Sequence, residues 1–225
     1  MLANILVKYF EAGGPVMWPI LITAIVAVAV VGERTFWWFR ESRKRDPETL
    51  EKLFAALENG DFSEASRLSK DSEDAVIRMI WHGMNHFHSS LQGALQVAAG
   101  VELQKAGRFL TVMDTLVTLA PLLGLLGTVS GIFRTFLSIG SATVEGATGA
   151  ITGGIGEALI ATMCGLAIAI VALIPFNYFS RKLAQLQFEL ESAATNVEIM
   201  VQAAKQKGFD TMEFRREPVA TARKG

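Results

Sequence analysis

One carboxylate, Glu157, stands near the start of an otherwise apolar run, GGIGEALIATMCGLAIAIVALIPFNYF. An ionised side chain in hydrocarbon costs about 3 kcal/mol or more, so it usually lines a water path or faces a protein partner. Gly153, Glu157, Ala161 and Gly165 recur every four positions, so Glu157 lies within a stripe of small residues on one helix face. We therefore expect it to face protein or water. The alternative is a helix-start charge at the headgroup level, which the helix dipole favours.

A second apolar run, APLLGLLGTVSGIFRTF, carries Gly124, Gly127 and Gly131 on one face, with Thr128 at its border. Small residues let helix backbones approach closely in lipid, where packing replaces the hydrophobic effect. One three-helix protomer is not expected to bury all of these small-residue stripes, so we expect a homo-oligomer that assembles through the second and third runs. A threonine such as Thr128 or Thr162 more often donates to a carbonyl of its own helix than it acts in chemistry.

The remaining polar residues give weaker signals. His82 and His86 are four apart, followed by His88, but no carboxylate or cysteine completes a metal site, so no metal is expected. Asp114 is expected at a membrane boundary, and Arg134 is expected to extend to lipid headgroups. The chain has no phosphate-binding loop, zinc-protease or nucleophile-elbow motif, and the sequence predicts neither an enzyme nor a cofactor.

The composition and its distribution predict an all-α membrane protein. The chain is 51% hydrophobic and 19% charged, whereas soluble domains carry about 25% charged residues. Three segments lack charged residues altogether: 12–32, 115–133 and 158–180. Because a helix needs about 20 such residues to cross the hydrocarbon, we expect three transmembrane helices. The first is too long for a cleaved signal peptide and is read as an anchor, and the single cysteine, Cys164, excludes an intrachain disulfide.

The basic residues predict the orientation. Five follow the first span: Arg34, Arg40, Arg43, Lys44 and Arg45. Arg181 and Lys182 follow the third, whereas the loop between the second and third spans has no lysine or arginine. By the positive-inside rule the N-terminus and this loop are periplasmic, and the C-terminus is cytoplasmic. Trp37 and Trp38 are expected in an aromatic belt at the inner end of the first span.

Helix signals organise the polar segments. Asp46-Pro47 and the Asp61–Glu64 pair predict two helix starts, Asn59-Gly60 predicts a stop, and a third short helix is expected from about Ser72. From residue 90 to 136 only Pro121 interrupts the helical pattern, and the third span continues to about Lys207, so two spans are expected to have long cytoplasmic extensions.

These signals divide the chain into segments. The expected segments are 1–39 (periplasmic N-terminus and first span), 40–107 (cytoplasmic helices), 108–134 (second span), 135–152 (periplasmic loop), 153–179 (third span) and 180–225 (helix extension and disordered tail).

The three spans together resemble a known family. GGPVMWPILITAIVAVAVVGER, APLLGLLGTVSGIFRTF and GIGEALIATMCGLAIAIVALIPFNYF are similar, in order, to the ExbB/TolQ/MotA proton-channel family. MotA-like subunits have four spans, so three spans favour the ExbB/TolQ branch, without separating ExbB from TolQ.

The resemblance implies a bacterial inner-membrane homopentamer, built around two copies of a single-span ExbD/TolR-like partner. Such a motor uses the proton-motive force to energise outer-membrane transport or cell-envelope processes, through a TonB/TolA-like protein. By motif, the proton pathway would include Thr128, Glu157 and Thr162, and the packing glycines would be Gly124, Gly127, Gly131, Gly153 and Gly165. The alternative is a structural membrane scaffold, whose small-residue stripes serve assembly alone.

Overall fold

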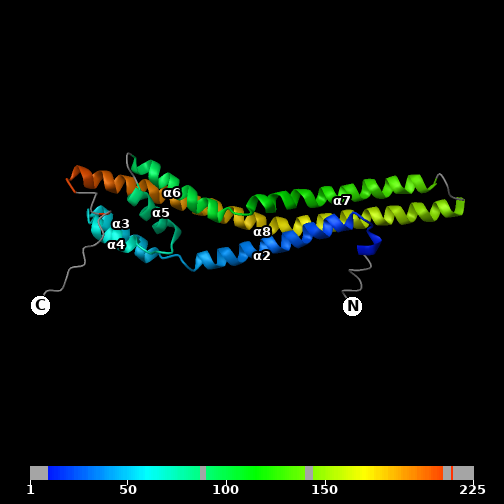
Figure 1. The fold of residues 1–225 in the computed structure, drawn as a ribbon, viewed down its shortest axis with the longest axis horizontal. Coiled ribbons are helices and arrows are strands. Elements are labelled where there is room, and N and C mark those ends of the chain that lie inside the picture. The colour runs from blue at the N-terminus through cyan, green and yellow to red at the C-terminus, as the bar shows by residue number, and fades with distance from the viewer. Residues whose placement is uncertain (1–9, 87–89, 140–143, 210–213, 215–225) are drawn as a thin grey trace. The chain divides into compact units, whose positions relative to one another are not determined.

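The described residues of the computed structural model are entirely helical apart from turns and linkers (Figure 1). It describes residues 10–86, 90–139, 144–209 and 214, without the side chains of 138, 139, 144–148 and 150. The predicted tail after Gly208 falls almost wholly outside these residues. The helices are α2 (Met17–Ser42), α3 (Pro47–Glu58), α4 (Phe62–Ser69), α5 (Ala75–His86), α6 (Leu91–Ala106), α7 (Leu110–Ile139) and α8 (Val144–Gln206).

Three of the described helices are long and apolar enough to cross a membrane. They contain the candidate spans Met17–Ser42, Leu110–Leu137 and Ile151–Gln206. The predicted all-α membrane fold with three spans is therefore confirmed. Helices α7 and α8 also occupy most of the segment 135–152, which the sequence predicts as a loop.

The chain divides into two compact units. The membrane unit comprises Met1–Thr35 and Phe109–Ser180, and the polar unit comprises Phe36–Arg108 and Arg181–Gly225. Helices α2 and α8 each contribute to both units, whereas α3 to α6 belong to the polar unit and α7 to the membrane unit.

The short helices α3 and α4 of the polar unit begin at capping aspartates, and α3 ends at a capping asparagine followed by glycine. The Asp46 carboxylate accepts a hydrogen bond from Thr49 N at 3.0 Å, and Asp61 accepts one from Glu64 N at 2.9 Å. Asn59 caps the end of α3, and Gly60 follows with φ +75°, a conformation that glycine adopts without a Cβ clash. These predicted starts and this stop are confirmed.

Helix α5 begins at Ala75, slightly later than the sequence predicts. The reason is Asp74, whose carboxylate accepts hydrogen bonds from Val76 N at 2.8 Å and Ile77 N at 3.4 Å. Asp71, with φ +62°, turns the chain before this cap. The Asp74 cap therefore fixes the start of α5.

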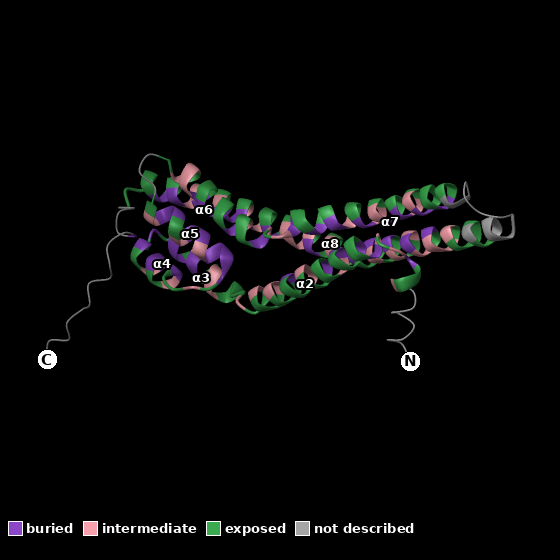
Figure 2. Cartoon of the chain, turned by 45° about the vertical axis from the view of Figure 1, so that its right-hand side comes forward, coloured by how far each residue is buried: buried purple, intermediate pink, exposed green. Residues whose placement is uncertain are grey.

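The core of the polar unit is formed by apolar faces of α3, α4, α5, α6 and the end of α8. Leu53, Ile77, Leu95 and Leu190 are fully buried within it, and Figure 2 shows the buried faces of α3, α4 and α5. Trp37 and Trp38 pack against this core. The sequence assigned both residues to a membrane-interface belt, because it gives no signal of a core beside the end of α2.

The helical pattern from residue 90 to 136 is broken, contrary to the sequence prediction of a continuous extension. Helix α6 ends at Ala106, where the capping Gly107 N–H donates to Leu103 O at 2.8 Å. Phe109 then adopts φ +64°, which costs about 1–3 kcal/mol outside glycine. Its ring lies 5.7 Å from the Arg34 guanidinium, a cation–π contact that compensates part of this cost.

The two prolines within long helices do not end them. Pro121 lies inside α7 and Pro175 inside α8. Helix α8 continues beyond the Arg181–Lys182 pair to Gln206, consistent with the expected extension of the third span.

Candidate functional site

Glycines of α7 pack directly against α8 in the membrane unit. A Cβ atom at Gly124 would lie 3.0 Å from Thr162 Cα, and one at Gly127 would lie 2.5 Å from Ala161 Cβ. At Gly131 it would meet Ala158 Cβ at 3.1 Å. Any larger side chain would separate the two helices, so these three glycines are required by close helix packing.

Of the two α8 glycines predicted to serve helix packing, Gly165 lies against α7 and Gly153 does not. A Cβ at Gly165 would lie 2.5 Å from Ala120 O, whereas nothing lies within 4 Å of one at Gly153. Gly154 takes the position expected of Gly153, because its Cβ would lie 3.3 Å from Gly131 O.

The α7 stripe and most of the α8 stripe are thus buried against each other within one chain. The sequence argument that they require other copies is wrong, because two adjacent membrane helices can bury both stripes together. This correction removes the glycine stripes as evidence for a homo-oligomer.

The two threonines of the predicted proton pathway lie near the seam between α7 and α8. Thr162 Oγ1 donates to Gly124 O on α7 at 2.9 Å, a hydrogen bond between the helices. Thr128, one turn beyond Gly124, donates to Leu125 O of its own helix at 2.7 Å. Both side chains are partly exposed. The Thr162 hydroxyl therefore has a packing role in one chain, and its lone pairs remain available as acceptors.

Glu157 lies at a junction of three segments. Its Oε1 accepts a hydrogen bond and ion pair from Nη2 of Arg134 on α7. Gly14, before α2, has φ +70°, and a Cβ there would lie 1.7 Å from the same oxygen. The sequence assigned Arg134 to lipid headgroups, but the structure pairs it with Glu157. The signal was present, since a lone cation and a lone anion occupy the adjoining ends of two consecutive spans.

The structure does not bring the three predicted pathway residues into one cluster. Glu157 and Thr162 are five residues apart, which is about 140° around an α-helix axis. Accordingly Glu157 contacts Arg134 and the Gly14 turn, whereas Thr162 contacts Gly124. In one chain the Glu157 carboxylate therefore lies on one side of the contact between α7 and α8, and the hydroxyls of Thr128 and Thr162 lie near its other side.

The weaker candidates have structural partners or exposed positions. His86 Nδ1 lies 3.0 Å from His82 O, and burial followed by the nearby His86 lowers the pKa of His82. His88 lies outside the described residues. Within the described ranges no group of three or more His, Cys, Asp or Glu side chains could hold a metal ion. Asp114 is exposed and Cys164 is half-buried.

A charged cluster in the polar unit has no counterpart in the sequence predictions. Arg78 Nη2 donates to Glu102 Oε2 at 2.6 Å and to Glu41 Oε1 at 3.0 Å. Lys105 adds a bond to Glu102 at 2.9 Å. Burial of Glu102 acts to raise the pKa of its carboxyl, but the hydrogen bonds from Arg78 and Lys105 outweigh it and leave that pKa below its usual value. The cluster joins α2, α5 and α6.

The fold and site define a class: an all-α membrane protein with three spans, close glycine packing between two of them, and a paired carboxylate at their junction. The chain belongs to the MotA/TolQ/ExbB proton channel family, whose sequence model matches residues 70–192. The resemblance carried by the three spans is thereby confirmed. Membership and the three apolar helices together make the chain a multi-pass inner-membrane protein.

Individual relatives cover most of the chain. The biopolymer transport protein ExbB-like 3 of Synechocystis sp. is 34% identical over 184 residues, which is 80% of this chain and 86% of that protein. ExbB-like 1 of the same organism is 35% identical over 178 residues, 76% of this chain and 69% of that protein. The Tol-Pal system protein TolQ of Haemophilus influenzae is 28% identical over 183 residues, 73% of each.

Proposed function

We propose that this chain is the proton-conducting subunit of an inner-membrane motor that uses the proton-motive force to energise outer-membrane transport or cell-envelope processes. Its place in the MotA/TolQ/ExbB proton channel family supports this role. The observation that carries the proposal is Glu157, an ionisable side chain held within the spans by a defined partner, Arg134. Ionisable residues at such positions mark ion and proton paths more often than lipid contacts.

In the proposed pathway Glu157 binds and releases protons, and the hydroxyls of Thr128 and Thr162 hydrogen-bond water or an acidic group on a partner. A hydroxyl serves as both donor and acceptor, which proton relay requires. Arg134 joins this set, because it compensates the charge of Glu157 whenever the carboxylate is ionised. The hydroxyls and the carboxylate lie on different sides of the α7–α8 seam, so a continuous path requires surfaces from neighbouring subunits.

The proposed assembly is a homopentamer that encloses two copies of a single-span ExbD/TolR-like partner and acts on a TonB/TolA-like protein. Relatives named ExbB and TolQ support the class of partner in this proposal. The chain would lie with its N-terminus and residues 135–152 in the periplasm and its C-terminus in the cytoplasm, as the distribution of lysine and arginine favours.

Replacement of the hydroxyls tests the proposal. Thr162→Val and Thr128→Val keep the side-chain shape, and each should lower proton-dependent activity about tenfold or more while the complex still assembles. The control is Thr115→Val, since Thr115 is exposed on α7, the helix that carries Thr128, and donates to Thr111 O. Activity is measured in cells as the rate of the outer-membrane transport or cell-envelope process that depends on the motor. Assembly is measured by copurification of the chain with its ExbD/TolR-like partner. Full activity in both variants would favour the scaffold interpretation.

A further inference from the structure

Asp114 is a carboxylate on a membrane span without a partner in the described part of the chain. It is the only charged residue between Arg108 and Arg134 in the sequence, and it lies on α7 within the candidate span Leu110–Leu137. Its side chain is exposed, and among the described residues its carboxylate makes no ion pair or hydrogen bond. In the same unit, by contrast, Glu157 pairs with Arg134.

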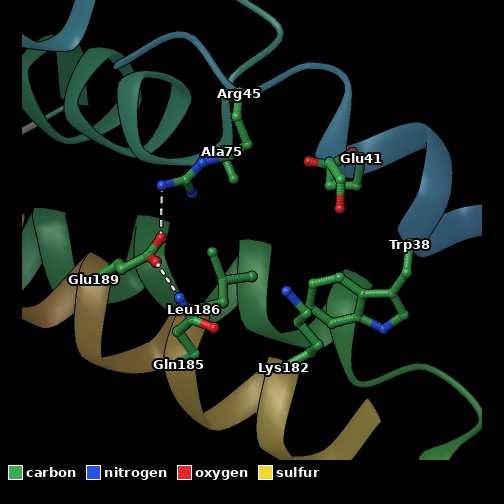
Figure 3. Close-up of a pocket in the computed structure, with 9 residues that line it drawn as sticks. Trp38, Glu41, Arg45, Ala75, Lys182, Gln185, Leu186 and Glu189 are labelled. Atoms are coloured by element: carbon green, nitrogen blue, oxygen red, sulfur yellow. Dashed lines mark hydrogen bonds and ion pairs between the residues drawn. The ribbon is translucent and has the colours of Figure 1, made fainter. Parts of the chain in front are cut away.

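A pocket of the polar unit shows how other carboxylates are accommodated. Glu189 Oε2 pairs with Arg45 Nη2 at 2.6 Å (Figure 3). Glu41, in the same lining, accepts from Arg78 Nη2 at 3.0 Å. A cation therefore compensates each of these charges in place. Asp114 differs, because its charge has to be solvated by water or by a group from another chain.

Neither helix-start stabilisation nor lipid contact accounts for this carboxylate. Asp114 lies beyond the first turn of α7, the turn in which the helix dipole favours an anion. In the proposed orientation it lies on the cytoplasmic side, where the leaflet surface carries a negative potential that repels a carboxylate. Water or a protein surface is therefore the favoured neighbour of Asp114.

Asp114 and Thr128 lie on one ridge of α7. The residues of this ridge recur at intervals of four and three, the spacing of one helix face: Asp114, Thr118, Pro121, Leu125 and Thr128. Its two ends are about 21 Å apart along the helix axis and about 40° apart around it. Arg134 lies about 160° around the helix from Asp114. The ridge is therefore on the side of the hydroxyls, away from the Arg134–Glu157 pair.

Polar atoms continue along the ridge between its two ends. Thr118 is exposed, and its hydroxyl donates to Thr115 O at 2.9 Å, which leaves its lone pairs free to accept. Pro121 has no N–H, so it cannot supply the helical hydrogen bond to Val117 O. An unpaired carbonyl is costly against lipid, whereas water in a lumen satisfies it. The ridge therefore favours a water path along its length.

We propose that Asp114 is the proton-release group at the cytoplasmic end of the pathway. This role rests on the proposed function and adds a second carboxylate to Thr128, Glu157 and Thr162. The Asp114 carboxylate accepts a proton that arrives through water along the ridge, and it then passes this proton to cytoplasmic water. Because the carboxylate returns to its ionised form after each transfer, no other reactant is consumed.

The test uses inverted membrane vesicles from cells that express the full-length chain with its ExbD/TolR-like partner. A proton gradient is imposed, and a pH-sensitive dye follows the proton leak in excess of that in vesicles without the motor. Asp114→Asn should lower this leak about tenfold or more, whereas Asp114→Glu should retain most of it. Thr115→Val is the matched control and should keep the leak, because Thr115 lies about 100° around α7 from Asp114, off the ridge.

Chemical rescue separates proton transfer from a structural role. The cytoplasmic face of these vesicles is outside, so an added impermeant buffer such as MES reaches the end of the pathway directly. At high concentration the buffer should raise the leak of Asp114→Asn about threefold or more, because it takes the proton in place of the carboxylate. The same buffer should not restore the leak in Thr128→Val, which interrupts the path before this point.

The variants at the two ends of the ridge distinguish this role from the proposed function. A full leak in Asp114→Asn together with a loss in Thr128→Val overturns the role of Asp114 and leaves the proposed function intact. Absence of a motor-dependent leak in wild-type vesicles overturns both. A loss in Asp114→Asn that the buffer does not restore overturns the role in proton release, since that result reflects the structure or assembly of α7.

Discussion

At the scale of single residues, the pairing of Glu157 with Arg134 explains how a carboxylate is kept among apolar helices. The exposed fractions of the two side chains are 24% and 43%, so the pair is neither deeply buried nor fully solvated. Gly14 lets the chain before α2 pass against the carboxylate, since any Cβ there would overlap it. The pair therefore also ties the segment before α2 to α7 and α8.

A double-mutant cycle measures this pairing. Arg134→Met leaves the Glu157 carboxylate without its partner, and Glu157→Gln leaves the guanidinium without its own. We expect each single variant to be destabilised and the double variant to lose less than the sum, with a coupling of about 1 kcal/mol. The measurement is unfolding of the purified chain by SDS titration. The exchanged pair, Arg134→Glu with Glu157→Arg, should recover part of the loss, and zero coupling would contradict the pairing.

At the scale of helices, the sequence predicted features that depend on neighbouring residues. The caps at Asp46 and Asp61 are local, because each carboxylate bonds an amide three residues ahead, and apolar length alone revealed the three spans. The break at Phe109 was missed, since its positive φ is accompanied by a contact with Arg34, far away in sequence. The sequence also predicted the wrong partner for the glycine stripes. Residue spacing shows that a helix face carries small residues, but it does not show which helix packs against that face.

The intrachain packing of the stripes gives a matched pair of glycine substitutions. At Gly131 a Cβ atom alone would already lie 3.1 Å from Ala158 Cβ, so the larger side chain of Gly131→Leu would not fit there. Gly153→Leu adds the same side chain where nothing lies within 4 Å. We expect Gly131→Leu to lower stability by about 1–3 kcal/mol or more and Gly153→Leu to leave it nearly unchanged. Stability is measured by SDS titration of the isolated chain, and equal effects at both positions would exclude the packing described for Gly131.

The cluster that joins α2, α5 and α6 predicts a response to acid. Because the folded-state pKa of Glu102 is lowered, its carboxylate stabilises the fold fully above its unfolded pKa of about 4.3. This contribution is lost as the pH falls through the lower folded-state value. Wild-type stability should therefore decrease below about pH 4.5, and Glu102→Gln should remove part of that decrease.

Thermal melting from pH 3 to pH 7 measures this response. Glu64→Gln serves as the comparison, because the hydrogen bond from Arg67 also lowers the pKa of Glu64 but at an exposed position. Its effect should be smaller, since water screens an exposed pair. A Glu102→Gln variant with the same pH dependence as the wild type would exclude Glu102 as the titrating group.

At the scale of the whole molecule, orientation in the membrane decides which end of the proposed pathway receives protons. Lysine and arginine follow the first and third spans, and none lies between residues 135 and 156. With three spans the two termini lie on opposite sides of the membrane. The uneven distribution of lysine and arginine therefore predicts the side on which every segment lies. In the proposed orientation Glu157, near the start of the third span, would lie toward the periplasm, the side from which protons enter the proposed pathway.

Cysteine labelling tests this orientation. In a Cys164→Ala background the chain has no other cysteine. Gly149 is exposed with nothing within 4 Å of a Cβ, and Ser42 is exposed at the end of α2, so a cysteine fits at either position. An impermeant maleimide added to intact spheroplasts should label Gly149→Cys and leave Ser42→Cys unlabelled, whereas both should react after the membrane is opened. The reverse pattern would place Glu157 toward the cytoplasm, and the direction of the proposed proton path would then be inverted.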